Sequence, residues 1–264
     1  MNPVNAANPF SQHAAPVDSP LQRLDARVKV VAALLLILGI LLTPDSAWVA
    51  YPLLWTLIGV LAAIARVSAW RLSRLAGVAL PFALVAVTLL FTTPGRPITA
   101  LAGLVITDAG LARFMGIVLK SWLAMHVALL LSLTTDFNDL LDALAHMGVP
   151  ATLVAIIGFM YRYLFTLKDE AERLLRARAA RSGVMPGLRP GGSLLWRARV
   201  AGGMVGNLFL RSYERSERVY AAMLARGYNG RMIRHEPVPL TWRAISLGAI
   251  PVVTVILIQI IVRW

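Results

Sequence analysis

Residues 162–182 read RYLFTLKDEAERLLRARAARS and open a basic stretch that continues to Arg234. This stretch contains fifteen Lys and Arg residues against five Asp and Glu residues, so it supplies +10 of the chain's net charge of +13. Apolar segments lie on both sides of it. Because Lys and Arg next to membrane spans stay on the cytoplasmic side, the stretch predicts a membrane protein whose working part faces the cytosol.

The composition of the whole chain agrees with this prediction. Hydrophobic residues make up 58% of the 264 residues, charged residues 15%, and the mean hydropathy is +0.69. These values argue against a soluble globular domain. The length leaves room for about five or six helical spans of about 20 residues each. We therefore expect an all-α polytopic membrane protein with about five transmembrane helices and a cytosolic helical module.

Five apolar segments are candidate spans: Val28–Thr43, Ala47–Ala65, Leu75–Thr93, Phe114–Leu133 and Ala244–Val262. The first is short, and we expect Arg27 and Lys29 at its start to extend to the lipid headgroups. With the N-terminus inside, the loop that carries Arg66, Arg71 and Arg74 also lies inside, as its charge requires.

This topology divides the chain into four parts. Residues 1–22 are expected to be a disordered cytosolic tail and not a signal peptide, because they lack both a basic leader and an apolar core. Residues 23–133 form a membrane domain with four spans, residues 134–240 a cytosolic set of helices, and residues 241–264 the final span.

Residues 151–167 are apolar enough to be a further span, interrupted only by Arg162. If they crossed, the whole basic stretch would be exported, which the distribution of positive charge opposes. We interpret them as a helix under the bilayer with its apolar start buried against the other helices. The helix begins after Pro150 and extends about 48 Å to Ser182.

Two further helices are expected in the cytosolic part. One covers residues 136–147, and the other continues for about thirty residues because apolar or small residues recur at helical spacing. These positions are Leu194, Ala198, Ala201, Val205, Leu208, Ser212, Ser216, Val219 and Met223, and arginines including Arg211 and Arg215 are expected elsewhere on the helix. Gly202 and Gly206 are four residues apart and predict close approach of another helix, with chance spacing as the alternative.

Two tripeptides are expected to end long helices, Ala180-Arg181-Ser182 and Ala225-Arg226-Gly227. Gly227 can take the left-handed conformation that closes a helix, which leaves Arg226 projecting from the end of a rigid rod. A guanidinium in that place can make bidentate contacts with a carboxylate of a partner. One helix-ending Ala-Arg-Gly is commonplace, but two similar tips suggest two similar partner surfaces.

Motifs for catalysis or cofactor binding are missing. There is no Gly-x-x-x-x-Gly-Lys phosphate loop, so if the protein works against a gradient, a partner has to bind ATP and its Mg²⁺. The four histidines are scattered without ligand spacing, and we expect no catalytic residue, no metal site and no cofactor in this chain. Lys120 and His126 lie inside the fourth span, and we interpret both as packing within the bundle.

Two other functions compete. Asn138-Asp139-Leu140-Leu141-Asp142, with Asp136 before it, is similar to the magnesium and diphosphate motif of membrane prenyltransferases. Such enzymes use a second Asp-rich motif that is missing here, and the alternative is the polar face of a surface helix. A basic membrane protein could also recruit nucleic acid or anionic lipid, and we expect lipid contact but no nucleic acid.

Several motifs together resemble the transmembrane (T) component of energy-coupling factor transporters, in particular the cobalt-type CbiQ group. They are LDARVK (24–29), FNDLLDAL (137–144), YRYLF (161–165), DEAER (169–173) and AAMLARGY (221–228). The resemblance implies that Arg181 and Arg226, with their neighbours, dock onto two ATP-binding cassette ATPase subunits. The first site reads Ala-Arg-Ser where the family has Ala-Arg-Gly.

The resemblance also implies that the long cytosolic helices are coupling helices that cross and carry a membrane-embedded substrate-binding (S) subunit. The substrate would be cobalt, with nickel as the close competitor, because substrate identity resides in the S subunit. The expected location is the bacterial inner membrane, with the N-terminus in the cytoplasm.

Overall fold

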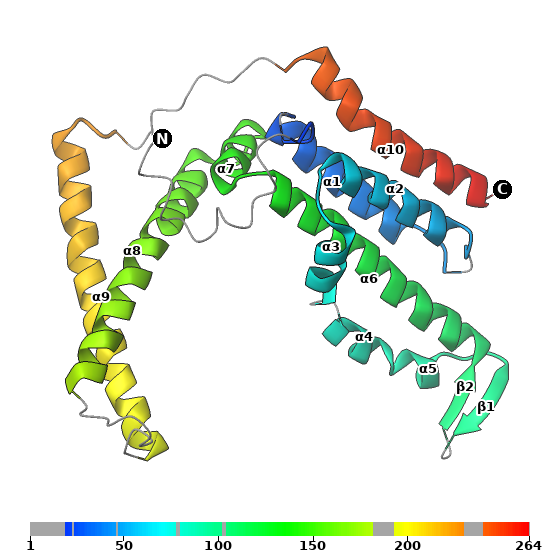
Figure 1. The fold of residues 1–264 in the computed structure, drawn as a ribbon, viewed down its shortest axis with the longest axis horizontal. Coiled ribbons are helices and arrows are strands. Elements are labelled where there is room, and N and C mark those ends of the chain that lie inside the picture. Colours follow the sequence, from blue (N-terminus) through cyan, green and yellow to red (C-terminus); the bar gives the residue numbers. More distant parts are fainter. Residues whose placement is uncertain are drawn as a thin grey trace. The chain divides into compact units, whose positions relative to one another are not determined.

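A computed structural model describes residues 19–22, 24–45, 47–77, 80–101, 104–181, 193–229 and 240–263 (Figure 1). The expected tail up to residue 18 and Ser182 lie outside these residues, as does the Gly- and Pro-rich segment 187–192 that is expected to link the two long helices. The chain forms two units by its internal contacts. We call residues 1–147 with 237–264 the bundle unit, and residues 148–236 the crossed-helix unit.

The bundle unit contains eight helices and two strands among its described residues. They are α1 (Ala26–Leu41), α2 (Ala50–Ile64), α3 (Ala69–Ala76), α4 (Leu80–Ala86), α5 (Leu89–Thr92), β1 (Pro97–Leu101), β2 (Leu104–Thr107), α6 (Asp108–Thr134), α7 (Phe137–His146) and α10 (Trp242–Arg263). The crossed-helix unit contains α8 (Ala151–Arg181) and α9 (Leu194–Ala225).

Apart from one short hairpin, the described chain is helical, which confirms the predicted all-α membrane protein. By length and apolar composition alone, α6, α8 and α10 are the described helices that can cross a membrane, and α2 is apolar but shorter. Helices α1, α2, α6 and α10 correspond to four of the five predicted spans. The antiparallel hairpin β1–β2 was not predicted, although β-branched residues such as Val105 and Ile106 favour strands.

The predicted third span, Leu75–Thr93, is not one continuous helix. It is broken into the end of α3, then α4 and α5, all three of which pack along α6 (Figure 1). Gly77 follows α3, and Pro81 lies in the first turn of α4, where its missing amide hydrogen costs nothing. A second break comes at Thr88, whose hydroxyl donates to the carbonyl oxygen of Val85 over 2.8 Å. Glycine and proline therefore divide an apolar run that hydropathy alone joins.

The core of the bundle lies between α1, α2, α3, α6 and α10. Its most deeply buried side chains include Ile40, Leu54 and Leu123, each at most 2% exposed. Helices α1 and α10 approach closely at two glycines, because a Cβ atom at Gly39 would collide with Val255 and one at Gly248 with Val28. The close approach of helices over small residues that membrane bundles favour is therefore found here.

Lys29 does not extend to the headgroups as expected. It is 7% exposed, and its Nζ atom donates to the carbonyl oxygen of Thr134 at the end of α6 over 2.9 Å. The last carbonyls of a helix lack partners and carry a partial negative charge, so a cation is favoured there. Lys29 therefore joins the start of α1 to the end of α6.

Lys120 faces the bundle, and its partner lies 75 residues away in the turn after α1. Its Nζ atom is 2.6 Å from Oδ1 of Asp45. The carboxylate fits against α6 because residue 116 is glycine: a Cβ atom there would lie 2.8 Å from Asp45 Oδ1 and 3.3 Å from the Tyr51 hydroxyl. This ion pair holds the turn between α1 and α2 against α6.

We expect Gly116→Ala to destabilise the bundle by about 1–3 kcal/mol, the usual range for forcing a methyl group into a packed site. The measurement is thermal unfolding of the purified protein in a neutral detergent. Gly59→Ala is the matched control, because Gly59 is also within a helix and nothing lies within 4 Å of its Cβ position. The control should leave stability unchanged or raise it by up to about 1 kcal/mol. Equal melting of the two variants would contradict the packing described here.

Candidate functional site

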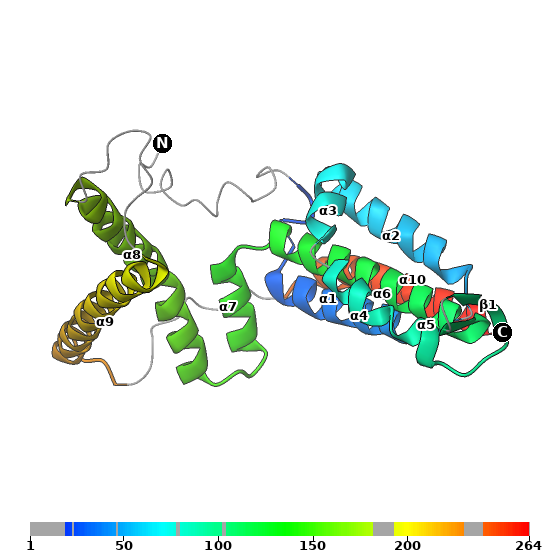
Figure 2. The same cartoon turned by 90° about the horizontal axis from the view of Figure 1, so that it is seen from below.

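The crossed-helix unit consists of two long helices that cross (Figure 2). Helix α8 follows Gly148, whose φ of 95° lies in the left-handed region, and Pro150. Helix α9 begins at Ser193, whose side chain accepts a hydrogen bond from the amide of Trp196 over 3.3 Å. The predicted start and length of both helices are confirmed, and the sequence therefore builds two rods of more than thirty residues each.

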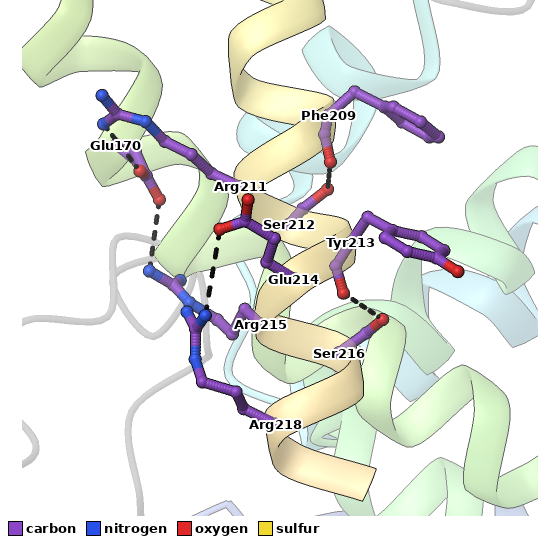
Figure 3. A network of polar contacts seen from close by, with 9 residues as sticks. All are labelled: Glu170, Phe209, Arg211, Ser212, Tyr213, Glu214, Arg215, Ser216 and Arg218. Atoms are coloured by element: carbon purple, nitrogen blue, oxygen red, sulfur yellow. Dashed lines mark hydrogen bonds and ion pairs between the residues drawn. The ribbon is translucent and has the colours of Figure 1, made fainter.

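Glu170 fixes the crossing (Figure 3). It is the one buried residue of α8, and its side chain is 10% exposed. Its Oε1 atom is 3.3 Å from Nη1 of Arg211, and its Oε2 atom is 3.3 Å from Nη2 of Arg215. Because the two arginines are four residues apart on α9, each carboxylate oxygen has its own guanidinium. We call these three residues the crossing clamp.

The crossing clamp was not predicted from the sequence. Arg211 and Arg215 lie outside the stripe of small and apolar positions on α9, as expected, but they pair with α8. The available signal was the spacing of Phe159, Tyr163, Leu167 and Glu170, which is four, four and three residues and keeps one face of a helix. The first three of these residues line the groove described next.

Beside the clamp, α8 and α9 enclose an apolar groove of about 360 Å³. The residues that line it are Phe159, Tyr163 and Leu167 from α8, Ser212, Arg215, Ser216, Val219, Tyr220 and Met223 from α9, and Tyr228 after α9. Four of them belong to the stripe of small and apolar positions predicted on the second long helix. That part of the stripe faces α8.

Most of both helices is uncovered by the described chain. Within the crossed-helix unit the apolar start of α8 is uncovered, because Leu153, Ile156 and Met160 are 51%, 57% and 63% exposed. Its burial against the other helices stays a prediction. Nothing described lies within 4 Å of a Cβ atom built at Gly202 or Gly206. Close approach of another helix at these two glycines stays a prediction.

Arg226 stands at the end of α9 in a fully formed helix cap. Gly227 has a φ of 83°, in the left-handed region. The amide of Tyr228 donates to the carbonyl oxygen of Met223 over 3.0 Å, and that of Gly227 to Leu224 over 2.9 Å. This pair of hydrogen bonds is the Schellman motif, which ends a helix abruptly and fixes the direction of its last residues. The Arg226 side chain is exposed and has no ion-pair partner among the described residues.

Arg181 is the last residue of α8 and is also exposed, without an ion pair in the described part of the chain. The small residues before the two arginines, Ala180 and Ala225, are exposed as well. One helical turn earlier, the Arg178 guanidinium lies 5.8 Å from the ring centre of Trp196, which ties the end of α8 to the start of α9. Arg181 and Arg226 therefore project from the ends of two helices that contact each other.

The acidic motif of α7 does not form a metal site. Asp136 is the N-cap residue of α7, and Asp139 lies in its first turn. Burial raises the pKa of the Asp139 carboxyl, and the nearby Asp136 carboxylate adds to the rise. Within the described residues, no three His, Cys, Asp or Glu side chains come together as metal ligands would. This geometry gives the prenyltransferase alternative no support.

His126 packs inside the bundle, as expected. It is 3% exposed, its Nδ1 atom lies 2.7 Å from the carbonyl oxygen of Trp122, and its ring lies against those of Trp55 and Trp122. His126 is therefore a packing residue of the bundle core.

Comparison with known proteins gives long matches. A family model described as "Cobalt transport protein", CbiQ, matches residues 18–237. The energy-coupling factor transporter transmembrane protein EcfT of Listeria innocua is 30% identical over 242 residues, 86% of this chain and 88% of that protein. EcfT of Brevibacillus brevis is 28% identical over 261 residues, 94% and 95% of the two chains. The nickel permease LarQ of Lactiplantibacillus plantarum is 34% identical over 125 residues, 47% and 43% of the two chains.

Proposed function

The chain belongs to the CbiQ family of cobalt transport proteins, and we propose that it is the transmembrane scaffold of an ATP-driven energy-coupling factor importer. The relatives that match along most of their length are named as transmembrane components of such transporters, so the chain is a transport subunit and not an enzyme. In the proposed complex, partner ATPases bind ATP and Mg²⁺, and a membrane-embedded subunit binds the substrate.

The observation that carries this proposal is the Arg226 tip. A rigid helix ends in a Schellman cap, and the cap presents an exposed guanidinium that forms no ion pair with any described residue. Such a group is suited to a bidentate contact with a carboxylate of a partner. Arg181 offers a second tip of the same kind, so we propose two ATPase subunits, one for each arginine.

The crossing clamp explains how motion would pass through this chain. Each long helix has little packing of its own, so the angle between them depends on Glu170 and the two arginines that hold it. When the ATPases close on ATP, the tips would be displaced and the rods would turn about the clamp. The exposed apolar faces of α8 and α9 would carry that motion to the substrate-binding subunit.

We propose cobalt as the substrate, with nickel as the alternative. The description of the matching family supports cobalt as the substrate, and the partial match to a nickel permease supports nickel as the alternative. Uptake of radiolabelled cobalt and nickel by cells that express the complete transporter separates the two. A transporter that accumulates nickel and excludes cobalt would reverse the assignment.

The proposed orientation has both tips in the cytosol, which also requires that α8 does not cross the membrane. The chain has no cysteine, so a single one is a unique label site. We expect Ala225→Cys to react with a membrane-impermeant maleimide only after the cells are permeabilised. Arg96→Cys, before β1, should react in intact cells. Labelling of Ala225→Cys in intact cells would refute the orientation and the docking role together.

Purification of the tagged chain from its native membrane tests the assembly. We expect two copies of ATP-binding cassette subunits and a small integral membrane protein to accompany it, identified by mass spectrometry. Purification of the chain without any ATPase, under conditions that keep the bundle folded, would contradict the scaffold function.

A further inference from the structure

Helix α3 carries an exposed basic and aromatic face. On its inner side Leu72 and Ala76 are 2% and 0% exposed, and the helix packs against α6. On its outer side Trp70 is 76% exposed, and Arg71 and Arg74 are exposed as well. The spacing of three and four residues puts Arg71 and Trp70 next to Arg74 on the helix surface. One short helix therefore has a side buried in the bundle and a side of two arginines and a tryptophan.

Arg66 adds a third arginine just before this helix, in an unfavourable backbone conformation. Its φ is 55°, and it is the one non-glycine residue with positive φ in the described chain. It closes α2 as Gly227 closes α9: its amide donates to Ala63, and that of Val67 to Ala62, each over 3.0 Å. Glycine is the residue usually found at this position of the cap. An arginine at this position is sterically unfavourable, so its presence indicates that the guanidinium group has a function.

These arginines lack anionic partners in the described part of the protein. Arg66, Arg71 and Arg74 are exposed and form no ion pair there. Guanidinium groups match phosphate oxygens in bidentate geometry, and an exposed tryptophan beside them is typical of the boundary between lipid and water. In the proposed orientation this loop lies at the cytoplasmic leaflet, where anionic headgroups are found.

We propose that Arg66, Trp70, Arg71 and Arg74 form a binding site for the phosphate headgroup of an anionic phospholipid. The tryptophan ring lies at the level of the headgroups, and the three guanidinium groups surround the phosphate. Because α3 is packed against α6, a lipid bound there holds the α2–α3 corner of the bundle against the membrane surface. The site rests on the membrane location and orientation proposed above, but not on the transport function.

The first test compares two double variants with the same change of charge. Each arginine near an anionic surface raises binding about fivefold, so we expect Arg71→Ala with Arg74→Ala to lower retention of phosphatidylglycerol about 25-fold. The control is Arg96→Ala with Arg113→Ala, two exposed arginines before β1 and in α6. Native mass spectrometry of the purified chain with added phosphatidylglycerol or phosphatidylcholine gives the bound fraction. Equal loss in both double variants, or unchanged retention in the first, would overturn the site.

The second test separates binding from folding. Glycine suits the left-handed conformation at position 66 better than arginine does, so Arg66→Gly should raise the melting temperature in lipid-free neutral detergent. The same variant should retain phosphatidylglycerol about fivefold less well. A variant that melts higher and binds this lipid as well as the wild type would remove Arg66 from the site. A merely structural arginine would not give opposite changes in stability and lipid retention.

Discussion

In an Arg226→Glu variant, we expect ATP-driven uptake to fall to background and association with the ATPases to weaken by at least about 30-fold. The lower bound follows from the cost of losing one partner of a desolvated charge pair, about 2–5 kcal/mol, and charge reversal adds repulsion. Membrane insertion and the fold should be unchanged, because the Arg226 side chain is exposed and its backbone hydrogen bonds do not depend on its identity. The measurements are substrate uptake and the amount of ATPase that co-purifies.

Arg218→Glu is the matched control for this prediction. Arg218 lies on the same helix, is 69% exposed and pairs only weakly, at 3.9 Å, with Glu214 of the same helix. The change of charge is the same, so a general electrostatic effect on partner binding would appear in both variants. We expect the control to keep most uptake. Normal uptake by Arg226→Glu, or equal loss in both, would refute the specific role of the α9 tip.

A change in the cap tests whether the direction of the tip matters in addition to its charge. Gly227→Ala keeps Arg226 but puts a Cβ atom on a residue with a φ of 83°, which costs about 1–2 kcal/mol. The helix end then relaxes and Arg226 loses its fixed direction. If ATPase binding depends on a fixed direction of the Arg226 guanidinium, Gly227→Ala should weaken ATPase association, but by less than Arg226→Glu does.

Much of this architecture can be read from local sequence. The positions of α7, α8, α9 and α10 follow from apolar periodicity, from Pro150 and from the glycines 148 and 227, because these signals act within one helix. The break of the third span could have been found from Gly77 and Pro81. Hydropathy averaged over a window joined the pieces because it does not register backbone breaks.

The paired charges could not be found in this way. Lys120 and Asp45 are 75 residues apart, and Glu170 is 41 residues from Arg211, so each pair depends on how distant helices pack. The sequence places Lys120 inside an apolar span, where an unpaired charge is costly, but it does not show which partner reaches it. The same limit applies to Gly39 and Gly248, whose close packing between α1 and α10 only the fold reveals.

For the crossing clamp, we expect Glu170→Arg to abolish uptake while the ATPases remain bound. The substitution puts a third guanidinium beside Arg211 and Arg215, so attraction becomes repulsion at the point where the two helices meet. The cost is about 1–3 kcal/mol, since the two arginines are 58% and 33% exposed and water screens part of the interaction. Both arginine tips are unchanged, so docking and ATP hydrolysis should continue without transport.

Two further variants make this prediction specific. Glu172→Arg changes the charge equally two residues away, where Glu172 pairs only within α8, with Lys168 and Arg176. It should transport at close to the wild-type rate. Glu170→Arg combined with Arg211→Glu and Arg215→Glu restores opposite charges across the crossing and should recover a substantial part of the uptake. A triple variant no better than the single one would show that Glu170 acts by another route.

The angle between α8 and α9 reports directly on the crossing clamp, which a measurement of uptake alone does not. Because the chain has no cysteine, spin labels at two introduced cysteines, one on α8 and one on α9 beyond the crossing, report a single distance. We expect a narrow distribution in the wild type and a broad one in Glu170→Arg. Taken with the ATPase measurements, this distance distinguishes two defects. Loss of Arg226 detaches the ATPases, whereas loss of the crossing clamp leaves the ATPases bound to helices α8 and α9, which no longer move together. A Glu170→Arg variant that keeps a narrow distribution and normal uptake would exclude the clamp as the pivot.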